Sequence, residues 1–189
     1  MRQSKDKKFY QDLLDEEQLL RYYRGRFAVR NDIIVDHVLS LLPDDASVID
    51  LAAGSSYIAE ALLKDNRVKH YNWNDFNPKL QSLVSRRVKD DRMKISSFDV
   101  DADSYSLAGY NVFVCVSMEH LERDCEALKK LDSGCVVSIC SPDLEDPAHV
   151  RSFKSLAEME DRYSSLLDIK IRQEHRDGVP KFILSGYKR

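Results

Sequence analysis

"VIDLAAGSS", residues 48–56, is an apolar stretch that contains one acid, Asp50, and runs into small residues. The apolar residues have the length and composition of a buried strand. A glycine and two serines then follow, as in a turn where the main chain passes close to another group. Two interpretations are open: a cofactor-binding turn, or a strand end with small residues after it.

Length and composition predict a single globular domain. The chain has 189 residues, of which 43% are hydrophobic and 32% charged. No apolar run approaches the roughly 20 residues that span a membrane, and the N-terminus lacks the apolar core of a secretory signal. The four cysteines lie outside any C-x-x-C spacing and mostly in apolar stretches. We therefore predict a reduced, cytoplasmic protein that does not associate with membranes.

The net charge of −3 argues against a strongly basic surface that binds nucleic acid without regard to sequence. Lys and Arg outnumber Asp and Glu in residues 1–30 and 151–189, whereas residues 31–150 are acidic. We expect a small-molecule substrate in preference to a nucleic-acid partner, which stays open as an alternative. The basic ends are the one feature that favours RNA.

Strand and helix patterns alternate through the middle of the chain. Short apolar strands are expected at 47–51, 68–73, 94–98, 111–116 and 135–140, with helices at about 57–64, 78–89 and 118–131. This order predicts an α/β fold, a Rossmann-like doubly wound and mostly parallel sheet covered on both faces. After a helix near 152–165, two strand candidates joined by "DGVP" predict a C-terminal antiparallel pair.

The N-terminal region is expected to hold two helices. The first covers residues 8–26 and is interrupted by Gly25, and the second covers about 31–42, with Asn31 as its N-cap and Pro43 after its end. His37 falls on the apolar stripe of the second helix, where we expect a packed core histidine. Residues 1–30 would then be a helical lid segment before a single domain, residues 31–189.

Acids follow three consecutive expected strands. In an open α/β sheet, ligands bind at the carboxyl ends of the strands, so Asp50, Asp75 and Asp99 are predicted to lie at one site. Taken singly, each has a simpler interpretation as a turn acid, an Asx turn or helix cap, or part of the polar loop "DVDAD". Neither the G-x-G-x-x-G of a dinucleotide site nor a phosphate-binding G-x-x-x-x-G-K-[ST] is present.

Six segments together resemble the motifs of class I S-adenosylmethionine (SAM)-dependent methyltransferases, most closely the small-molecule and ubiquinone-type members. In chain order they are "VIDLAAGSS", "NWNDFNP", "SSFDVDAD", "YNVFVCVSMEHLERD", "LDSGCVVSICSPD" and "AHVRSF". The resemblance implies a class I methyltransferase fold with SAM as cofactor. It also implies transfer of a methyl group to an oxygen or nitrogen of a small acceptor by in-line displacement.

The resemblance also implies a role for each matching position. Residues after the first strand would hold the methionine end of SAM: Asp50, the main chain of Ala52, Ala53 and Gly54, and Ser55 at the helix N-terminus. The adenosine would be bound by Asp75 at the ribose hydroxyls, Phe76 on the adenine, Asp99 at the adenine amino group and the Val100 N–H. A carbonyl of Cys115 or Val116 would lie near the methionine amino group, and Asp101 competes with Asp99.

Two substitutions depart from the first motif, since Ala52 and Ser56 replace glycines. Ala52 is tolerable if its φ is negative, and Ser56 can cap the following helix.

Three residues are candidates for a base that acts on the acceptor: His120, His149 and Glu119. "EH" with a later histidine is similar to the E-x-x-E-H signature of metal-dependent small-RNA 2′-O-methyltransferases, but Val116 stands where that signature has its first glutamate. We therefore expect no metal.

The acceptor site is expected to involve residues 143–165 and the stretch "RYYRGRF", which contains Tyr22, Tyr23, Arg24 and Arg26. That stretch has an equally plausible interpretation as a helix packing face. His175, near the final hairpin, is expected to be exposed. Two alternatives to a small-molecule methyltransferase stay open: a methyltransferase that acts on RNA or protein, and a non-catalytic methyltransferase-like subunit that binds a partner.

Overall fold

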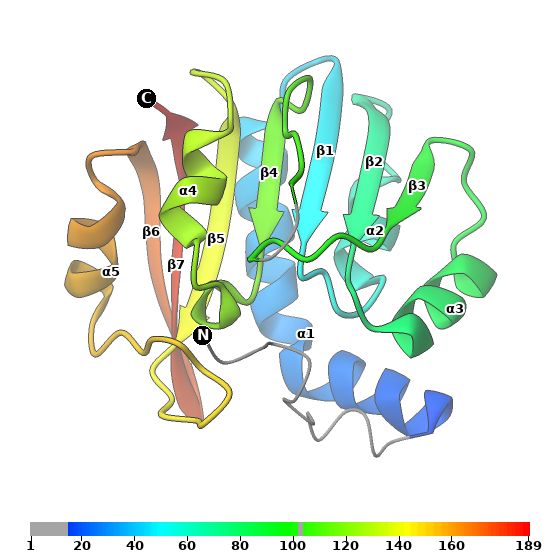
Figure 1. The fold of residues 1–189 in the computed structure, drawn as a ribbon, viewed down its shortest axis with the longest axis horizontal. Coiled ribbons are helices and arrows are strands. Elements are labelled where there is room, and N and C mark those ends of the chain that lie inside the picture. The colour runs from blue at the N-terminus through cyan, green and yellow to red at the C-terminus, as the bar shows by residue number, and fades with distance from the viewer. Residues whose placement is uncertain (1–14, 102–103) are drawn as a thin grey trace.

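The fold is built on a seven-stranded sheet with the strand order β3-β2-β1-β4-β5-β7-β6 (Figure 1). It is seen in a computed structural model that describes residues 15–101 and 104–189. The parallel strands are β1 (Ala46–Leu51), β2 (Val68–Asn74), β3 (Met93–Ser96), β4 (Val112–Cys115) and β5 (Val136–Pro142). The strand order reverses between β1 and β4, which places their carboxyl ends at the predicted ligand site.

The chain ends in the expected antiparallel pair, β6 (Leu167–Asp177) and β7 (Val179–Lys188), with β7 paired to β5. The turn is tighter than "DGVP" suggested, because Asp177 pairs with Val179 and Gly178 alone reverses the chain at φ 73°. Glycine adopts this left-handed conformation without the steric cost of a Cβ atom.

Helices cover both faces of the sheet. α1 (Glu16–Leu41), α2 (Tyr57–Leu62) and α3 (Pro78–Arg87) pack in one apolar cluster, and α4 (Asp124–Lys129) and α5 (Leu156–Tyr163) pack in the other. Neighbouring strand residues belong to opposite clusters, as Val48 and Ile49 do in β1. Both are fully buried, as expected of a parallel strand in the middle of a covered sheet.

The predicted break between two N-terminal helices is wrong, because α1 is a single helix that runs through Gly25. It begins at a capping box in which Asp15 and Gln18 accept each other's main-chain N–H groups. A glycine costs a helix only about 1 kcal/mol relative to alanine, and packing of the later turns outweighs this. Figure 1 shows that α1 bends and that its first part passes the carboxyl ends of the strands.

Side chains within α1 also refine the predictions. Asn31 caps no helix, since its Oδ1 accepts a hydrogen bond from Arg30 Nε at 3.0 Å. His37 is a packed core histidine, as predicted, with Nδ1 3.1 Å from Ser185 Oγ and Nε2 2.9 Å from Gln173 Oε1. Residues 8–14 of the expected first helix lie outside the described residues.

The helix expected at 118–131 is divided into a 3₁₀ turn, η3 (Met118–His120), and α4. Leu121 between them is extended. The Asp101 carboxylate accepts the N–H groups of Glu122 at 3.1 Å and Arg123 at 2.9 Å, while Arg151 donates to the Leu121 carbonyl. These long-range bonds satisfy main-chain groups that a continuous helix would have paired internally.

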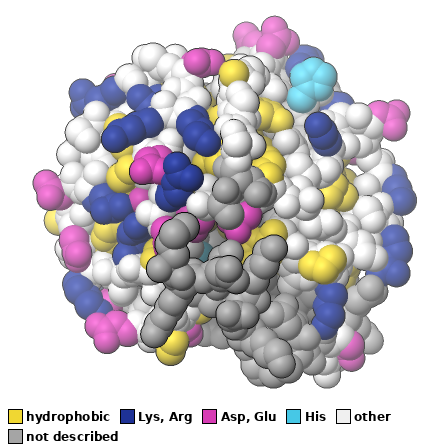
Figure 2. Space-filling model, viewed as in Figure 1, with side chains coloured by type: hydrophobic (Ala, Val, Ile, Leu, Met, Phe, Trp, Pro, Cys, Tyr) yellow, Lys and Arg dark blue, Asp and Glu magenta, His cyan; other side chains and the backbone are white. Residues whose placement is uncertain are grey.

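Charged side chains of both signs are interspersed on the face shown in Figure 2, so the described Lys and Arg residues there form no single basic patch. Among the described residues, no helix combines the length and apolar character needed to cross a membrane.

Candidate functional site

The turn after β1 is joined directly to the end of β2. Ala53 N donates to the Asn74 carbonyl at 3.1 Å, and Gly54 N donates to Asp75 Oδ2 at 2.9 Å. Ala52 and Gly54 both have left-handed backbones, with φ of 50° and 61°. The condition of a negative φ at Ala52 is therefore not met. The turn keeps the conformation that glycine would adopt, although an alanine occupies it.

Asp50 is fully buried beneath this turn. Its Oδ2 accepts a hydrogen bond from the Tyr71 hydroxyl at 2.7 Å, and its Oδ1 has no hydrogen-bond partner among the described residues. Burial raises the pKa of Asp50 to about 7, with a further rise from nearby Asp75 and opposing contributions from the Tyr71 hydrogen bond and Arg30. A buried carboxyl with an unused oxygen is costly to the fold, and a polar ligand would satisfy it.

Asp75 lies at the end of β2, as predicted, and is 8% exposed. Besides accepting from Gly54, its carboxylate accepts the Asn77 N–H at 2.9 Å, so the simpler Asx-turn interpretation is also correct. Burial raises its pKa to about 6, and these two N–H groups oppose the rise. Phe76 beside it is 56% exposed, unusual for so large an apolar side chain.

Asp99 and Asp101 differ in their hydrogen-bond partners. Both Asp101 oxygens accept the main-chain N–H groups before α4, whereas Asp99 Oδ1 accepts the Asp101 N–H at 2.9 Å. Both Asp101 oxygens therefore hold the main chain at the start of α4. Val100 is buried, and the ring of Phe98 stacks on that of Tyr105 with the ring centroids 4.8 Å apart.

Arg30 is a site residue that the sequence did not reveal. Its guanidinium is buried, and it donates to the Val116 carbonyl at 3.3 Å and to Asn31 Oδ1. This contact occupies one of the two carbonyls considered for the methionine amino group, while Cys115 is fully buried in β4. Arg30 stands 86 residues from Val116, in a segment expected to be a helix break, so no local pattern marked it.

The serines of the first motif lie at the start of α2. Ser55 Oγ accepts the Tyr57 N–H at 3.4 Å. Ser56 occupies the N-cap position, but its hydroxyl donates to Glu60 and makes no cap hydrogen bond. Ser55 therefore makes the capping hydrogen bond expected of Ser56, and at 3.4 Å this bond is weak.

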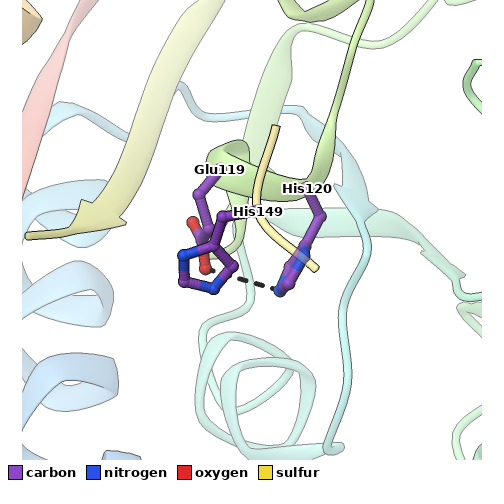
Figure 3. Close-up of side chains that lie close together, drawn as sticks. All are labelled: Glu119, His120 and His149. Carbon is purple, nitrogen blue, oxygen red and sulfur yellow. Dashed lines mark ion pairs between the residues drawn. The ribbon is translucent and has the colours of Figure 1, made fainter. Parts of the chain in front are cut away.

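The three candidate bases lie together at the ends of β4 and β5 (Figure 3). Glu119 and His120 belong to η3, and His149 comes from the segment between β5 and α5. Glu119 Oε1 is 3.7 Å from His120 Nε2, and the two imidazole rings are 4.8 Å apart, edge to face. Glu119 is 5% exposed, and burial raises its pKa to about 8.

A surface hollow of about 320 Å³ adjoins this cluster. It is lined by residues 145–147 and 149–152, which include His149 and Arg151. Its size is at the lower end of small-molecule sites.

Two other sequence predictions concern the stretch "RYYRGRF" and His175. The side chains of Tyr22, Tyr23, Arg24 and Arg26 lie outside the described residues. His175 is partly buried in β6 opposite Lys181, so it is less exposed than expected.

No protein-family model matches the chain, and no curated protein matches its sequence. Solved structures do match. The N-methyltransferase NodS from Bradyrhizobium japonicum, in complex with S-adenosyl-L-homocysteine, superposes over 93% of this chain and 94% of its own, with a TM-score of 0.74 and 12% identity. The chain has the class I methyltransferase fold.

Two further structures agree with this assignment. A TehB-like SAM-dependent methyltransferase from Corynebacterium glutamicum matches 92% of this chain and 98% of its own, at a TM-score of 0.66 and 16% identity. A methyltransferase from Haloferax volcanii, in complex with the activator Trm112, matches 90% of this chain and 96% of its own, at 0.69 and 12%. The fold predicted from the motifs is confirmed. Because one fold supports many functions, activity must be argued from the site.

The residues present are compatible with SAM. Asp75 and Asp99 follow neighbouring strands at one edge of the sheet, and Phe76 offers an exposed ring beside Asp75. The unsatisfied Oδ1 of Asp50 lies under a turn with the left-handed backbone of a glycine-rich loop. These features fit a ligand that carries ribose hydroxyls, a flat base and a polar tail.

Proposed function

We propose that the chain is a SAM-dependent methyltransferase that acts on a small acceptor. The observation that carries the proposal is the bond from Gly54 N to Asp75 Oδ2, which joins the turn after β1 to the acid after β2, next to the point between β1 and β4 where strand order reverses. Asp75 would hold the ribose hydroxyls and Asp99 the adenine. Asp50 and the main chain of residues 52–54 would hold the methionine end.

When bound, SAM supplies a methyl group on a positively charged sulfur that leaves readily in an in-line displacement. The protein's contribution is chiefly to place the acceptor on the line of attack and to exclude water. Glu119, His120 and His149 lie beyond β4 and β5 and are the polar groups that would receive the acceptor. The shallow hollow beside His149 gives an acceptor access to these groups from the surface.

The setting that we propose is the cytoplasm. Three of the four cysteines are buried, and none of the four is in a disulfide in the described structure. A reducing compartment keeps such thiols unpaired. The first part of α1, which passes the carboxyl ends of the strands in Figure 1, would act as a lid over the site.

Isothermal titration calorimetry with S-adenosylhomocysteine tests the proposal. We expect one site per chain, with affinity reduced at least tenfold by Asp75→Ala and little changed by Asp36→Asn, which alters an exposed acid on α1. Absence of binding to folded protein, or equal binding by Asp75→Ala, would overturn the proposal.

A further inference from the structure

The cluster of Glu119, His120 and His149 is built from two segments that the main chain ties together. Val150 N donates to the Glu119 carbonyl at 2.8 Å, and His120 Nδ1 lies 3.2 Å from the Ala148 carbonyl. One potential ligand atom from each of the three side chains lies within 4.8 Å of the others. Figure 3 shows the three side chains converging on a common point.

A main-chain carbonyl faces Nδ1 of both imidazoles. His120 Nδ1 and His149 Nδ1 face the carbonyls of Ala148 and Leu144, at 3.2 Å and 2.8 Å. A carbonyl only accepts hydrogen bonds, so in a neutral ring Nδ1 carries the hydrogen and Nε2 is the nitrogen with the lone pair. Metal-binding histidines are oriented in the same way by a carbonyl or carboxylate on the other ring nitrogen.

Glu119 is the acidic member of the cluster, and its carboxylate would be the anionic ligand of a bound cation. It is 5% exposed, and its Oε2 is buried with no hydrogen-bond partner among the described residues. Arg30, which interacts electrostatically with Glu119, donates its hydrogen bonds to Asn31 and to the Val116 carbonyl. The Ser141 hydroxyl lies close to Glu119, and a cation coordinated by the cluster would further stabilise this buried carboxyl.

We propose that Glu119, His120 and His149 bind one divalent first-row transition metal ion. Two imidazole nitrogens and a carboxylate suit Zn²⁺, Mn²⁺, Fe²⁺ or Co²⁺, whereas Mg²⁺ prefers oxygen ligands alone. Bonds of about 2.0–2.2 Å place tetrahedral ligands roughly 3.4 Å apart. The 3.7 Å from Glu119 Oε1 to His120 Nε2 is close to this value. The three ligand atoms lie within 4.8 Å of one another, so His149 must move about an ångström closer to the other two ligands. His149 lies in a segment without helix or strand.

This proposal replaces the expectation of no metal, which rested on Val116 in place of a fourth ligand. Three protein ligands with an open position are the usual set of a catalytic metal site. A metal ion lowers the pKa of a hydroxyl or water that occupies such a position. Resting on the proposed function, the inference therefore favours an acceptor that presents a hydroxyl oxygen over one that presents an amine.

The test is metal binding by full-length protein that has been treated with chelator and dialysed. We expect titration with ZnCl₂ to show one site per chain, Co²⁺ to give visible absorption bands, and MgCl₂ to bind at least a hundredfold more weakly. His149→Asn and His120→Asn should each weaken Zn²⁺ binding at least tenfold. His70→Asn, at an exposed histidine on β2, should leave it unchanged.

Absence of a stoichiometric Zn²⁺ site, or the same affinity in His149→Asn as in the wild type, would overturn the inference. His149 lies on a surface segment, so its replacement remains informative if Glu119→Gln fails to fold. S-adenosylhomocysteine affinity should change less than threefold in His149→Asn. Cofactor binding without metal binding would refute only this inference, whereas metal binding without cofactor binding would refute the proposed function.

Discussion

Replacing Asp50 with asparagine should make folding less sensitive to pH. Asp50 has a pKa of about 7 in the folded protein, against 3.8 for an unperturbed group, because it is fully buried next to Asp75. The folded state therefore binds this proton more tightly than the unfolded state. A carboxyl with a raised pKa contributes stability that falls as pH rises from about 4 to about 7.

The magnitude follows from the interval over which the two states differ. Each pKa unit corresponds to about 1.4 kcal/mol, so between pH 5 and pH 8 Asp50 should remove about 3 kcal/mol from the free energy of unfolding. Asp50→Asn does not titrate, and its Oδ1 can still accept the Tyr71 hydrogen bond. The variant should therefore gain about 3 kcal/mol relative to the wild type when pH is raised from 5 to 8.

Urea denaturation at pH 5 and pH 8, followed by circular dichroism, measures this difference of differences. Asp36→Asn makes the same chemical change on an exposed face of α1 and should show no such gain. If Asp50→Asn loses as much stability as the wild type between the two pH values, the buried, protonated state assigned to Asp50 is incorrect. The variant should also bind S-adenosylhomocysteine more weakly, since we infer that this costly acid is retained for its ligand.

Three further changes test the local geometry, each by urea denaturation at pH 7. Ala52→Gly relieves a left-handed alanine and should raise the free energy of unfolding by about 0.5–1 kcal/mol. Ala53→Gly, at the next position, should lower it by about 1 kcal/mol. The opposite order would contradict the backbone strain at Ala52. Asp124→Ala should lower the free energy of unfolding by about 3–5 kcal/mol, because Asp124 is 1% exposed and pairs with Arg151 and Arg162. A loss below 1 kcal/mol would contradict this buried network. Gly186→Ala should lower the free energy of unfolding by about 2 kcal/mol or more, since the new Cβ would lie 2.2 Å from the Asp168 carbonyl oxygen. An unchanged free energy would show that β6 and β7 are farther apart than described.

Local patterns predicted the sheet well because each buried strand is a short apolar run with turn residues at its end. β1, β2, β4 and β5 fall within one or two residues of the expected ranges. The errors arise where distant groups decide the backbone. The break at η3 depends on Asp101 and Arg151, and α1 continues through Gly25 because of packing on the sheet.

The site was predictable to the extent that it depends on strand ends. Asp50 lies near the end of β1, and Asp75 and Asp99 follow β2 and β3, so the sheet rule predicts them at one edge of the sheet. Arg30 and Tyr71 were missed because their roles depend on contacts with Val116 and Asp50 that span 86 and 21 residues. The left-handed backbone at Ala52 could not be read from an alanine, since glycine is the residue that signals it.

The most direct test of the central claim, a SAM site at the carboxyl ends of β1, β2 and β3, is a crystal structure with S-adenosylhomocysteine bound. We expect the ribose hydroxyls within about 3 Å of the Asp75 carboxylate, a hydrogen-bonding distance. The adenine should lie between Phe76 and Asp99, and the sulfur should face the Glu119, His120 and His149 cluster. A ligand bound elsewhere on the protein, or an adenosine that makes no contact with Asp75, would contradict the account.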